Sequence, residues 1–201
     1  RRGAAPRRGA RRVNPATHAL IGWAVANVAP SLPRRERAIA FFGSLVPDLD
    51  GLTLLGGHEL FEEWHRKLCH NVLFAALSTA AAVALARSRR GLVAALFLVN
   101  FHLHLLCDYW GSASPPDPVT HESRTWTIPY FLPFSDFRFD NPRQWALNAW
   151  PNFLITFLFA ALAVWIARRY GRTPVEPFSL RAEAAVLETL RRRFDGPRAG
   201  G

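Results

Sequence analysis

The sequence contains no methionine and only two cysteines, Cys69 and Cys107, among its 201 residues. Two cysteines do not make the disulfide framework of a small secreted domain, and we expect both to fill space near the site described below. Because no methionine marks a start, we expect translation of the natural protein to begin at Val13, through an alternative start codon. Residues 1–12 would then be a disordered, non-native, Arg-rich extension, and they lack the apolar core of a complete signal peptide.

Acidic residues are scarce relative to basic ones. The chain has 15 Asp and Glu against 25 Lys and Arg, which gives a formal net charge of +10. Six arginines lie within residues 1–12, and without them the net charge is +4. Much of the remaining positive charge lies in short connections between apolar runs, as expected of a membrane protein. We therefore expect no nucleic acid as a partner.

Apolar residues are abundant and separated from the charged connections. They make up 50% of the chain, although the mean hydropathy is only +0.02. The runs 71–86, 91–109 and 149–167 approach or reach the roughly 20 residues that cross a bilayer core. Two shorter runs, 18–29 and 38–46, predict short spans or re-entrant helices. Because irregular backbone cannot face lipid, we predict an all-α, multi-span transmembrane helical bundle.

Arginines predict the orientation of this bundle. If every run crosses the membrane, nine arginines fall on one side, in three short connections: Arg34, Arg35, Arg37, Arg87, Arg89, Arg90, Arg168, Arg169 and Arg172. The positive-inside rule assigns that side to the cytoplasm. After residue 172 two prolines mark a linker, and residues 173–201 are predicted to form this linker and a cytoplasmic amphipathic helix on anionic lipid. A solvated tail helix is the alternative.

Ionisable residues inside one apolar run predict a functional site. A charged side chain in a span costs about 2.5–3.5 kcal/mol on insertion scales, so it tends to be there for function. Asn100, His104 and Asp108 recur every four residues and therefore share one helix face. The last two suit neighbouring ligands of a metal. His102 points roughly 200° away from His104 and is expected to pack or to support the ligands.

Three further motifs lie at the ends of other apolar runs. Thr17 is expected to cap a helix that carries His18, and Pro47 precedes the acidic pair of Asp48 and Asp50. His65 and His70 are five residues apart, which does not place two imidazoles on one helix face. Both can reach one site if His65 lies on a loop and His70 lies in the first turn of the next helix. In the alternating topology, seven residues reach one membrane face and are predicted to hold metal: His18, Asp48, Asp50, His65, His70, His104 and Asp108.

Mixed imidazole and carboxylate ligands suit zinc, and manganese or iron less specifically. Seven candidates exceed the four ligands of one tetrahedral ion, so further ions or supporting residues are expected. The predicted cofactor is a divalent metal, zinc by preference, with one to three ions.

The order of the motifs resembles the bacterial inner-membrane metal-dependent hydrolase family, whose members are also described as LexA-binding hydrolases. The resemblance covers roughly residues 14–140 and rests on Thr17-His18 before a helix with Gly22, Pro47-Asp48-x-Asp50, His65-Arg66-x3-His70, His104-x3-Asp108 and the stretch 132–135. The chain departs from the family pattern at Cys69, where Thr is frequent, and at Gly51, where His is frequent. The family is similar in motif to zinc-dependent phospholipase C, so the resemblance implies phosphoester hydrolysis.

We therefore predict a membrane-bound metal-dependent hydrolase domain over residues 13–172. Asp50 is a ligand or a base that orients the water, Arg66 pairs with a phosphate oxygen, and His121 is a general acid. The alternatives are an interfacial snorkelling arginine for Arg66 and a solvated loop residue for His121. The aromatic stretch 126–139 lines the entrance or, as we favour, anchors the loop at the membrane interface.

A site at the interface favours a lipid-linked or amphiphilic substrate, with membrane lipid as the surrounding partner. The expected location is the bacterial inner membrane, with several crossings and with the site on the extracytoplasmic side. The alternatives are an intramembrane metal-handling or transport protein, and a noncatalytic membrane protein with a structural metal site.

Overall fold

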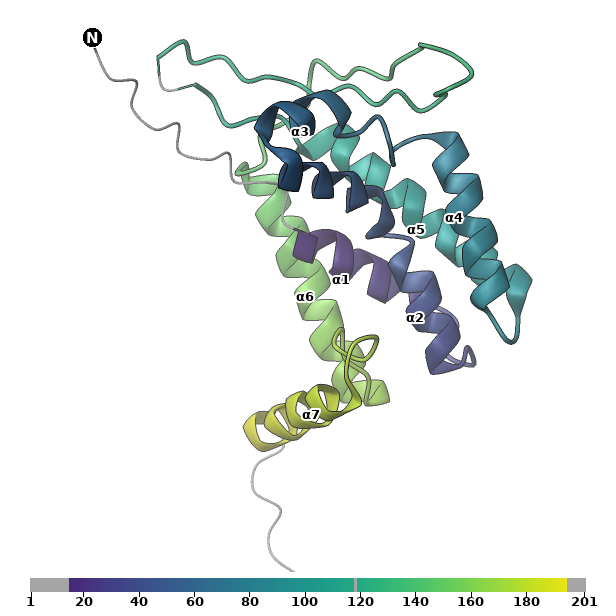
Figure 1. Ribbon diagram of the computed structural model, residues 1–201. Helices are drawn as coiled ribbons and strands as arrows, with labels where there is room; N and C mark the ends of the chain where they lie inside the picture. The colour runs from purple at the N-terminus through teal and green to yellow at the C-terminus, as the bar shows by residue number, and fades with distance from the viewer. Residues whose placement is uncertain (1–14, 118, 195–201) are drawn as a thin grey trace, which may run out of the picture.

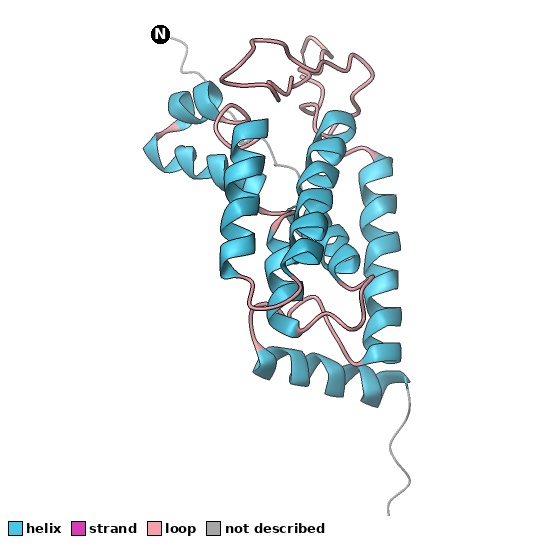
Figure 2. Ribbon diagram, turned by 90° about the vertical axis from the view of Figure 1, so that its right-hand side faces the viewer, coloured by secondary structure: helices cyan, strands magenta, loops and turns pink. Residues whose placement is uncertain are grey.

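The computed structural model describes residues 15–117 and 119–194, and the regular secondary structure within them is helical (Figures 1 and 2). The elements are α1 (Pro15–Ala26), α2 (Arg34–Phe42), the 3-10 helix η1 (Val46–Gly56), α3 (His58–Trp64), α4 (Val72–Leu85), α5 (Arg90–Gly111), α6 (Trp150–Tyr170) and α7 (Leu180–Phe194). Within the described ranges the only β-type pairs are two isolated bridges, Ala113 with Ala146 and Ile128 with Phe139. The predicted all-α fold is confirmed. The predicted extension at residues 1–12 lies outside the described residues.

Two helices, α5 and α6, are long and apolar enough to cross a membrane. The pair of α2 and η1 also qualifies when taken together, but it bends by 56° at its junction, as a broken span or a re-entrant segment does. α1 and α4 are apolar but short. With 14 residues α4 extends about 21 Å at 1.5 Å per residue, less than the roughly 30 Å of a bilayer core. The described chain therefore has two candidate spans, or three if the bent pair is one span.

α6 presents much of its apolar surface to the outside of the bundle. Phe153, Phe157 and Leu158 are 65%, 68% and 54% exposed, and Trp150 and Trp165 near its two ends are also exposed. Contiguous apolar surface of this size is unfavourable in water and favourable in lipid. The packing of α6 thus agrees with its role as a span.

The core forms around α5, which packs against α1, α2, α4 and η1, while α1 also packs against α6. Trp23, Phe41 and Val93 are almost completely buried in it. Asn100 ties three helices together, because its amide donates to the carbonyl oxygens of Gly22 on α1 at 3.1 Å and Ala40 on α2 at 2.8 Å. This polar contact holds α1 and α2 in register against α5.

α1 and the turn after α2 approach each other closely at Gly22. A Cβ atom at this position would overlap the side chain of Ser44. Thr17 lies inside α1, which begins at Pro15, and its hydroxyl hydrogen-bonds that of Thr156 on α6 at 2.6 Å. The prediction that Thr17 caps this helix is therefore wrong, because the helix starts earlier and the side chain joins two helices instead.

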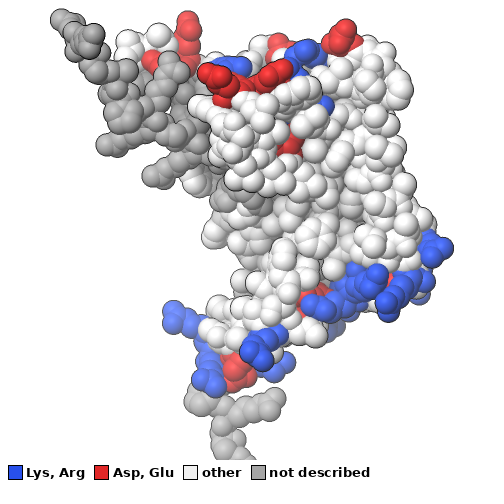
Figure 3. Space-filling model, viewed as in Figure 1, with Lys and Arg blue, Asp and Glu red and all other residues white. Residues whose placement is uncertain are grey.

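The segment after α6 turns back and covers one end of the bundle. Glu176 forms a buried ion pair with Arg37 of α2, and α7 lies across the end of α6 (Figure 1). The predicted C-terminal helix is present at Leu180–Phe194. Figure 3 shows Lys and Arg atoms gathered at this end, an uncharged middle and a second, mixed group of charges at the opposite end.

Candidate metal centre

Four segments deliver ionisable side chains to one place near the end of α5 that lies away from α7. α1 supplies His18, η1 supplies Asp48 and Asp50, and α5 supplies His104 and Asp108. The connection between α3 and α4 supplies His65, Arg66 and His70. Contacts below 4 Å link all of these residues into one cluster. Residues far apart in the sequence therefore lie together, as the helix-end placement predicted.

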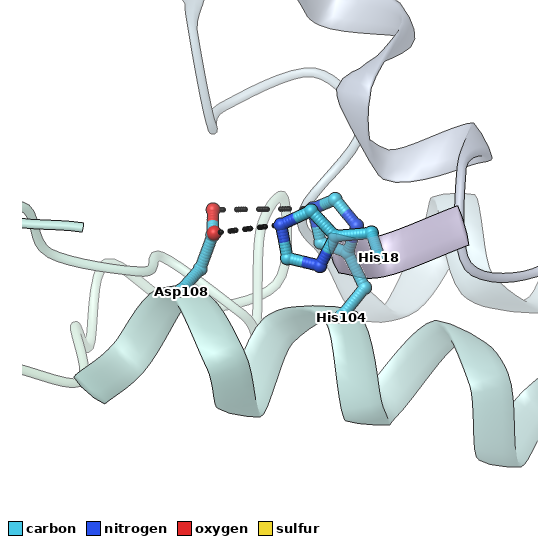
Figure 4. Close-up of side chains that lie close together, drawn as sticks. All are labelled: His18, His104 and Asp108. Atoms are coloured by element: carbon cyan, nitrogen blue, oxygen red, sulfur yellow. Dashed lines mark ion pairs between the residues drawn. The ribbon is translucent and has the colours of Figure 1, made fainter. Parts of the chain in front are cut away.

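Asp108 is the centre of the cluster. Its carboxylate lies 3.5 Å from Nε2 of His18, 3.4 Å from Nε2 of His70 and 3.9 Å from Nε2 of His104. Figure 4 shows the imidazoles of His18 and His104 side by side, both reaching toward this carboxylate. Their ring centroids are 3.9 Å apart. Arg66 completes the shell with an ion pair of 3.0 Å from Nη2 to Oδ2 of Asp108.

Hydrogen bonds from the far side of the rings fix how two of the imidazoles point. His104 donates from Nδ1 to the backbone carbonyl of Ser44 at 2.8 Å. His70 donates from Nδ1 to Asp50 at 2.9 Å. Each bond places the proton on Nδ1 and leaves Nε2 with a lone pair directed at the centre.

The nitrogens in the centre lack hydrogen-bond partners. Among the described residues, Nε2 of His18, His70 and His104 are all buried without one, as is Oδ1 of Asp108. Buried polar atoms are normally satisfied, because an unpaired one costs about 1–3 kcal/mol. Several unpaired lone-pair atoms facing one another form a group that could hold a cation.

The distances between these atoms fit a cation. Two ligand atoms of a tetrahedral ion with bonds of about 2.1 Å lie roughly 3.4 Å apart. The measured separations around Asp108 run from 3.4 to 3.9 Å, longer than good hydrogen bonds. Within the described chain, two triads have ligand atoms close enough to share an ion: His18, His104 and Asp108, and Asp48, His70 and His104. His104 belongs to both triads, so they form one continuous centre.

Asp48 is the ligand candidate that solvent reaches. Its side chain is 33% exposed, whereas that of His104, 3.6 Å away, is fully buried. The centre is therefore closed on the helix side and open beside Asp48.

Asp50 contacts His70 on the side of the ring that faces away from Asp108, and His65 contacts Asp50. The carboxylate of Asp50 accepts from Nδ1 of His65 at 2.8 Å, Nδ1 of His70 at 2.9 Å and the peptide N–H of Arg66 at 2.7 Å. His65 stacks on Phe61, with centroids 4.4 Å apart. Neither residue belongs to the triads above. Their assignment as metal ligands remains a prediction, and the geometry favours a supporting role for both.

The connection that carries Arg66 is tightly bent. Arg66 has a φ of 70°, in the left-handed region that costs a non-glycine residue about 1–2 kcal/mol. Its peptide N–H and its guanidinium are both used, by Asp50 and Asp108 respectively. His70 lies just before α4, whose N-cap is Asn71, and not in the first helical turn as the spacing suggested. The bend brings His65 and His70 to the same carboxylate without a shared helix face.

His121 does not join the cluster. It is exposed in the loop between α5 and α6, and its peptide N–H donates to the carbonyl of Asp117. The structure therefore offers no contact that supports its predicted role as a general acid.

Trp126 begins the aromatic stretch 126–139, which the sequence placed either at the entrance or at the membrane interface, and it lies against the site. Its ring meets that of His65 edge to face at 5.8 Å, and the guanidinium of Arg66 lies over it at 5.5 Å. One aromatic among many in a loop carries no signal that distinguishes it. The exposed His102 hydrogen-bonds the hydroxyl of Tyr130 at 2.7 Å and stays outside the centre, as its helical phase predicted.

Cys69 is buried near Asp50, and burial raises the pKa of its thiol to about 12. The thiol is thus uncharged at neutral pH, and neither cysteine belongs to a candidate triad of the described residues. This agrees with the expectation that the cysteines fill space.

Comparison with curated proteins and with solved structures finds no match. A family model described as YdjM inner membrane protein matches residues 13–187, a stretch that contains every predicted metal ligand. The match supports the bacterial inner membrane as the location and the membrane character of the helices. It carries no similarity to hydrolases or to phospholipase C. The chain belongs to the YdjM inner membrane protein family.

Proposed function

We propose that this protein is a membrane-bound metal-dependent hydrolase that cleaves a phosphoester bond in a lipid-linked or amphiphilic substrate. One observation carries the proposal. Three buried imidazole nitrogens without hydrogen-bond partners converge on the carboxylate of Asp108 at ligand-like separations.

The residues that would hold the metal are His18, Asp48, His70, His104 and Asp108. Imidazole and carboxylate donors together suit zinc. A bound divalent ion supplies a water molecule acidified to a pKa of about 7 and offsets negative charge on a phosphoester in the transition state. Asp48, on the open side, marks where water and substrate reach the centre.

Asp50 and Arg66 support the chemistry. Asp50 holds His70 in the tautomer that presents Nε2, and it also fixes His65 and the backbone of Arg66. Arg66 is 3% exposed, and its Nε and Nη1 have no hydrogen-bond partner among the described residues. A phosphate oxygen of the scissile ester would accept from one of these two donors in a charge-assisted hydrogen bond, and the other donor would stay free for a further oxyanion.

An apolar cavity of about 230 Å³ supports an amphiphilic substrate. It lies between α1, α5 and α6, with Leu106, Phe153 and Ile155 in its walls and His18 at the side of the metal centre. Leu106 and Phe153 are also 51% and 65% exposed, so the cavity opens on the surface between the two candidate spans. A hydrocarbon chain would enter it directly from the lipid.

The distribution of charge supports an extracytoplasmic site. Lys and Arg side chains gather at the end of the molecule that carries α7, and acidic and basic side chains are mixed at the other end (Figure 3). His104 and Asp108 lie near the end of α5 that points away from α7 (Figure 1). By the positive-inside rule the arginine-rich end faces the cytoplasm. The centre then opens on the outer side of the inner membrane, with two or three crossings below it.

The test combines metal analysis with a generic phosphodiester assay on protein purified in detergent. His70→Ala and His104→Ala each remove a ligand, so we expect bound zinc to fall well below that of the unaltered protein and hydrolysis of bis(p-nitrophenyl) phosphate to disappear. His102→Ala is the matched control, because this histidine lies on the same helix but is exposed. If both ligand variants keep the metal content of the unaltered protein, the proposed centre does not exist.

A further inference from the structure

A second cavity, of about 260 Å³, lies on the loop side of the metal centre. Its walls come from α3, from the connection between α3 and α4 and from the loop between α5 and α6. His65 and Arg66 line it and also belong to the cluster around the centre. The cavity and the metal centre are therefore adjacent and share side chains.

The walls of this cavity are strongly basic. They contain four cationic side chains and one carboxylate: Arg66, Lys67, Arg124 and Arg138 against Glu62. Glu62 pairs with Arg124 at 2.7 Å, and Arg66 pairs with Asp108 at 3.0 Å, so Lys67 and Arg138 are the two cations of these walls that keep no carboxylate partner in the described chain. Opposite walls of like charge repel each other unless an anion lies between them.

Arg66 supplies the second, independent observation. Its guanidinium is 3% exposed, lies over the ring of Trp126 at 5.5 Å and bonds Asp108 through Nη2. Nε and Nη1, the other two guanidinium nitrogens, are buried without hydrogen-bond partners in the described chain. A buried cation with unused donors is costly, and an oxyanion removes that cost.

We propose that this cavity binds an anionic head group of the substrate, a phosphate by preference, in addition to the ester group that reaches the metal centre. The inference rests on the proposed function and extends it to the substrate class: an amphiphile with a second negative charge beyond the bond that is cleaved. Lys67 and Arg138, the cations of the walls without a carboxylate partner in the described chain, attract the head group at the rim. Arg66, whose guanidinium lies over the ring of Trp126, receives it at the inner end, where guanidinium donors match the oxygens of a phosphate.

The test measures binding without added metal, in nanodiscs of neutral lipid at low salt, by titration calorimetry with dodecyl phosphate and with inorganic phosphate. In the double variant Lys67→Gln/Arg138→Gln we expect dodecyl phosphate to bind about tenfold more weakly, or worse, because two charge-assisted contacts are lost. Arg143→Gln, an exposed arginine of the same loop outside the cavity, is the matched control and should bind as the unaltered protein does. Arg138→Gln alone repeats the test with a smaller change at an exposed position.

Equal affinity for dodecyl phosphate in the unaltered protein and in both cavity variants would overturn the inference. Inorganic phosphate should bind more weakly than dodecyl phosphate, and equal binding of the two would assign the cavity to a free anion instead of a lipid head group. The result is separable from the proposed function. Failure of the proposed function appears as missing metal or missing hydrolysis in the unaltered protein, whereas failure of this inference appears as unchanged binding in the variants.

Discussion

Replacing Asp50 by asparagine separates a supporting role from a ligand role at the metal centre. The carboxylate is fully buried and accepts three hydrogen bonds, from His65, His70 and the backbone of Arg66. An asparagine amide would keep the shape but offer only one oxygen acceptor, so at least one of the three donors would meet an N–H group. The variant Asp50→Asn thus changes the hydrogen bonding without opening a cavity.

These contacts set the expected size of the loss in metal affinity. Losing the charge weakens every bond to this residue, since charge-assisted hydrogen bonds are roughly twice as strong as neutral ones. His70 then becomes a poorer ligand, and loss of such an orienting partner typically lowers metal affinity about 10- to 100-fold, or about 1.4–2.8 kcal/mol. Removing a ligand itself, as in His104→Ala, should cost more.

The assay is zinc affinity by competition with a chelator, together with the visible spectrum of the cobalt-substituted protein. We expect Asp50→Asn to bind zinc more weakly while the cobalt bands keep their positions and intensities, because the ligands are unchanged. Asp136→Asn, at an exposed position in the loop, is the control and should match the unaltered protein. Unchanged zinc affinity in Asp50→Asn would refute the orienting role, and an altered cobalt spectrum would make Asp50 a ligand.

Three further predictions concern the bundle and the metal. Asn100→Leu removes two interhelical hydrogen bonds, and because Oδ1 of Asn100 already lacks a partner among the described residues we expect a loss of only about 1–2 kcal/mol in unfolding free energy, measured by thermal unfolding in detergent. Gly22→Ala forces a Cβ into the side chain of Ser44 and should cost about 1–3 kcal/mol in the same measurement; a neutral effect would mean that α1 shifts freely. Removal of divalent ions by a chelator should abolish hydrolysis and added zinc should restore it, whereas activity that survives chelation would exclude the metal from the reaction.

The helices and the meeting of the site residues were predictable from the sequence. Apolar runs give the positions of the helices, and motifs at the ends of consecutive runs fall on one side if the chain alternates. The lengths were less certain. The run at 71–86 becomes α4 with 14 residues, and the run at 38–46 becomes part of a bent pair with η1. Hydropathy measures the affinity of a segment for lipid, but it does not report local signals such as the Asn71 side chain that caps the start of α4.

The sequence did not predict which acidic residue of the site contacts the candidate ligands directly and which one supports them. Asp48 and Asp50 are two residues apart in one acidic motif, yet one lies beside His104 and the other accepts hydrogen bonds behind the ligands. The different positions of Asp48 and Asp50 depend on the 3-10 geometry of η1, and the spacing of the two residues in the sequence does not predict a 3-10 helix. The acceptor for His104 is the backbone carbonyl of Ser44, a group that every residue has and that no sequence pattern can mark.

The placement of the polar groups bears on the rival functions. A transporter needs polar or ionisable groups along a path between the two faces. Below the metal centre the described core consists of large apolar side chains such as Trp23, Phe41 and Val93, with Asn100 bonded to helix carbonyls. This arrangement favours a site that works from one face. A structural metal site surrounds its ion with protein ligands, whereas here Asp48 is a third exposed and a basic cavity adjoins the centre. An open position next to cations is what hydrolysis of an anionic ester requires, and this is why we favour a hydrolase over both alternatives.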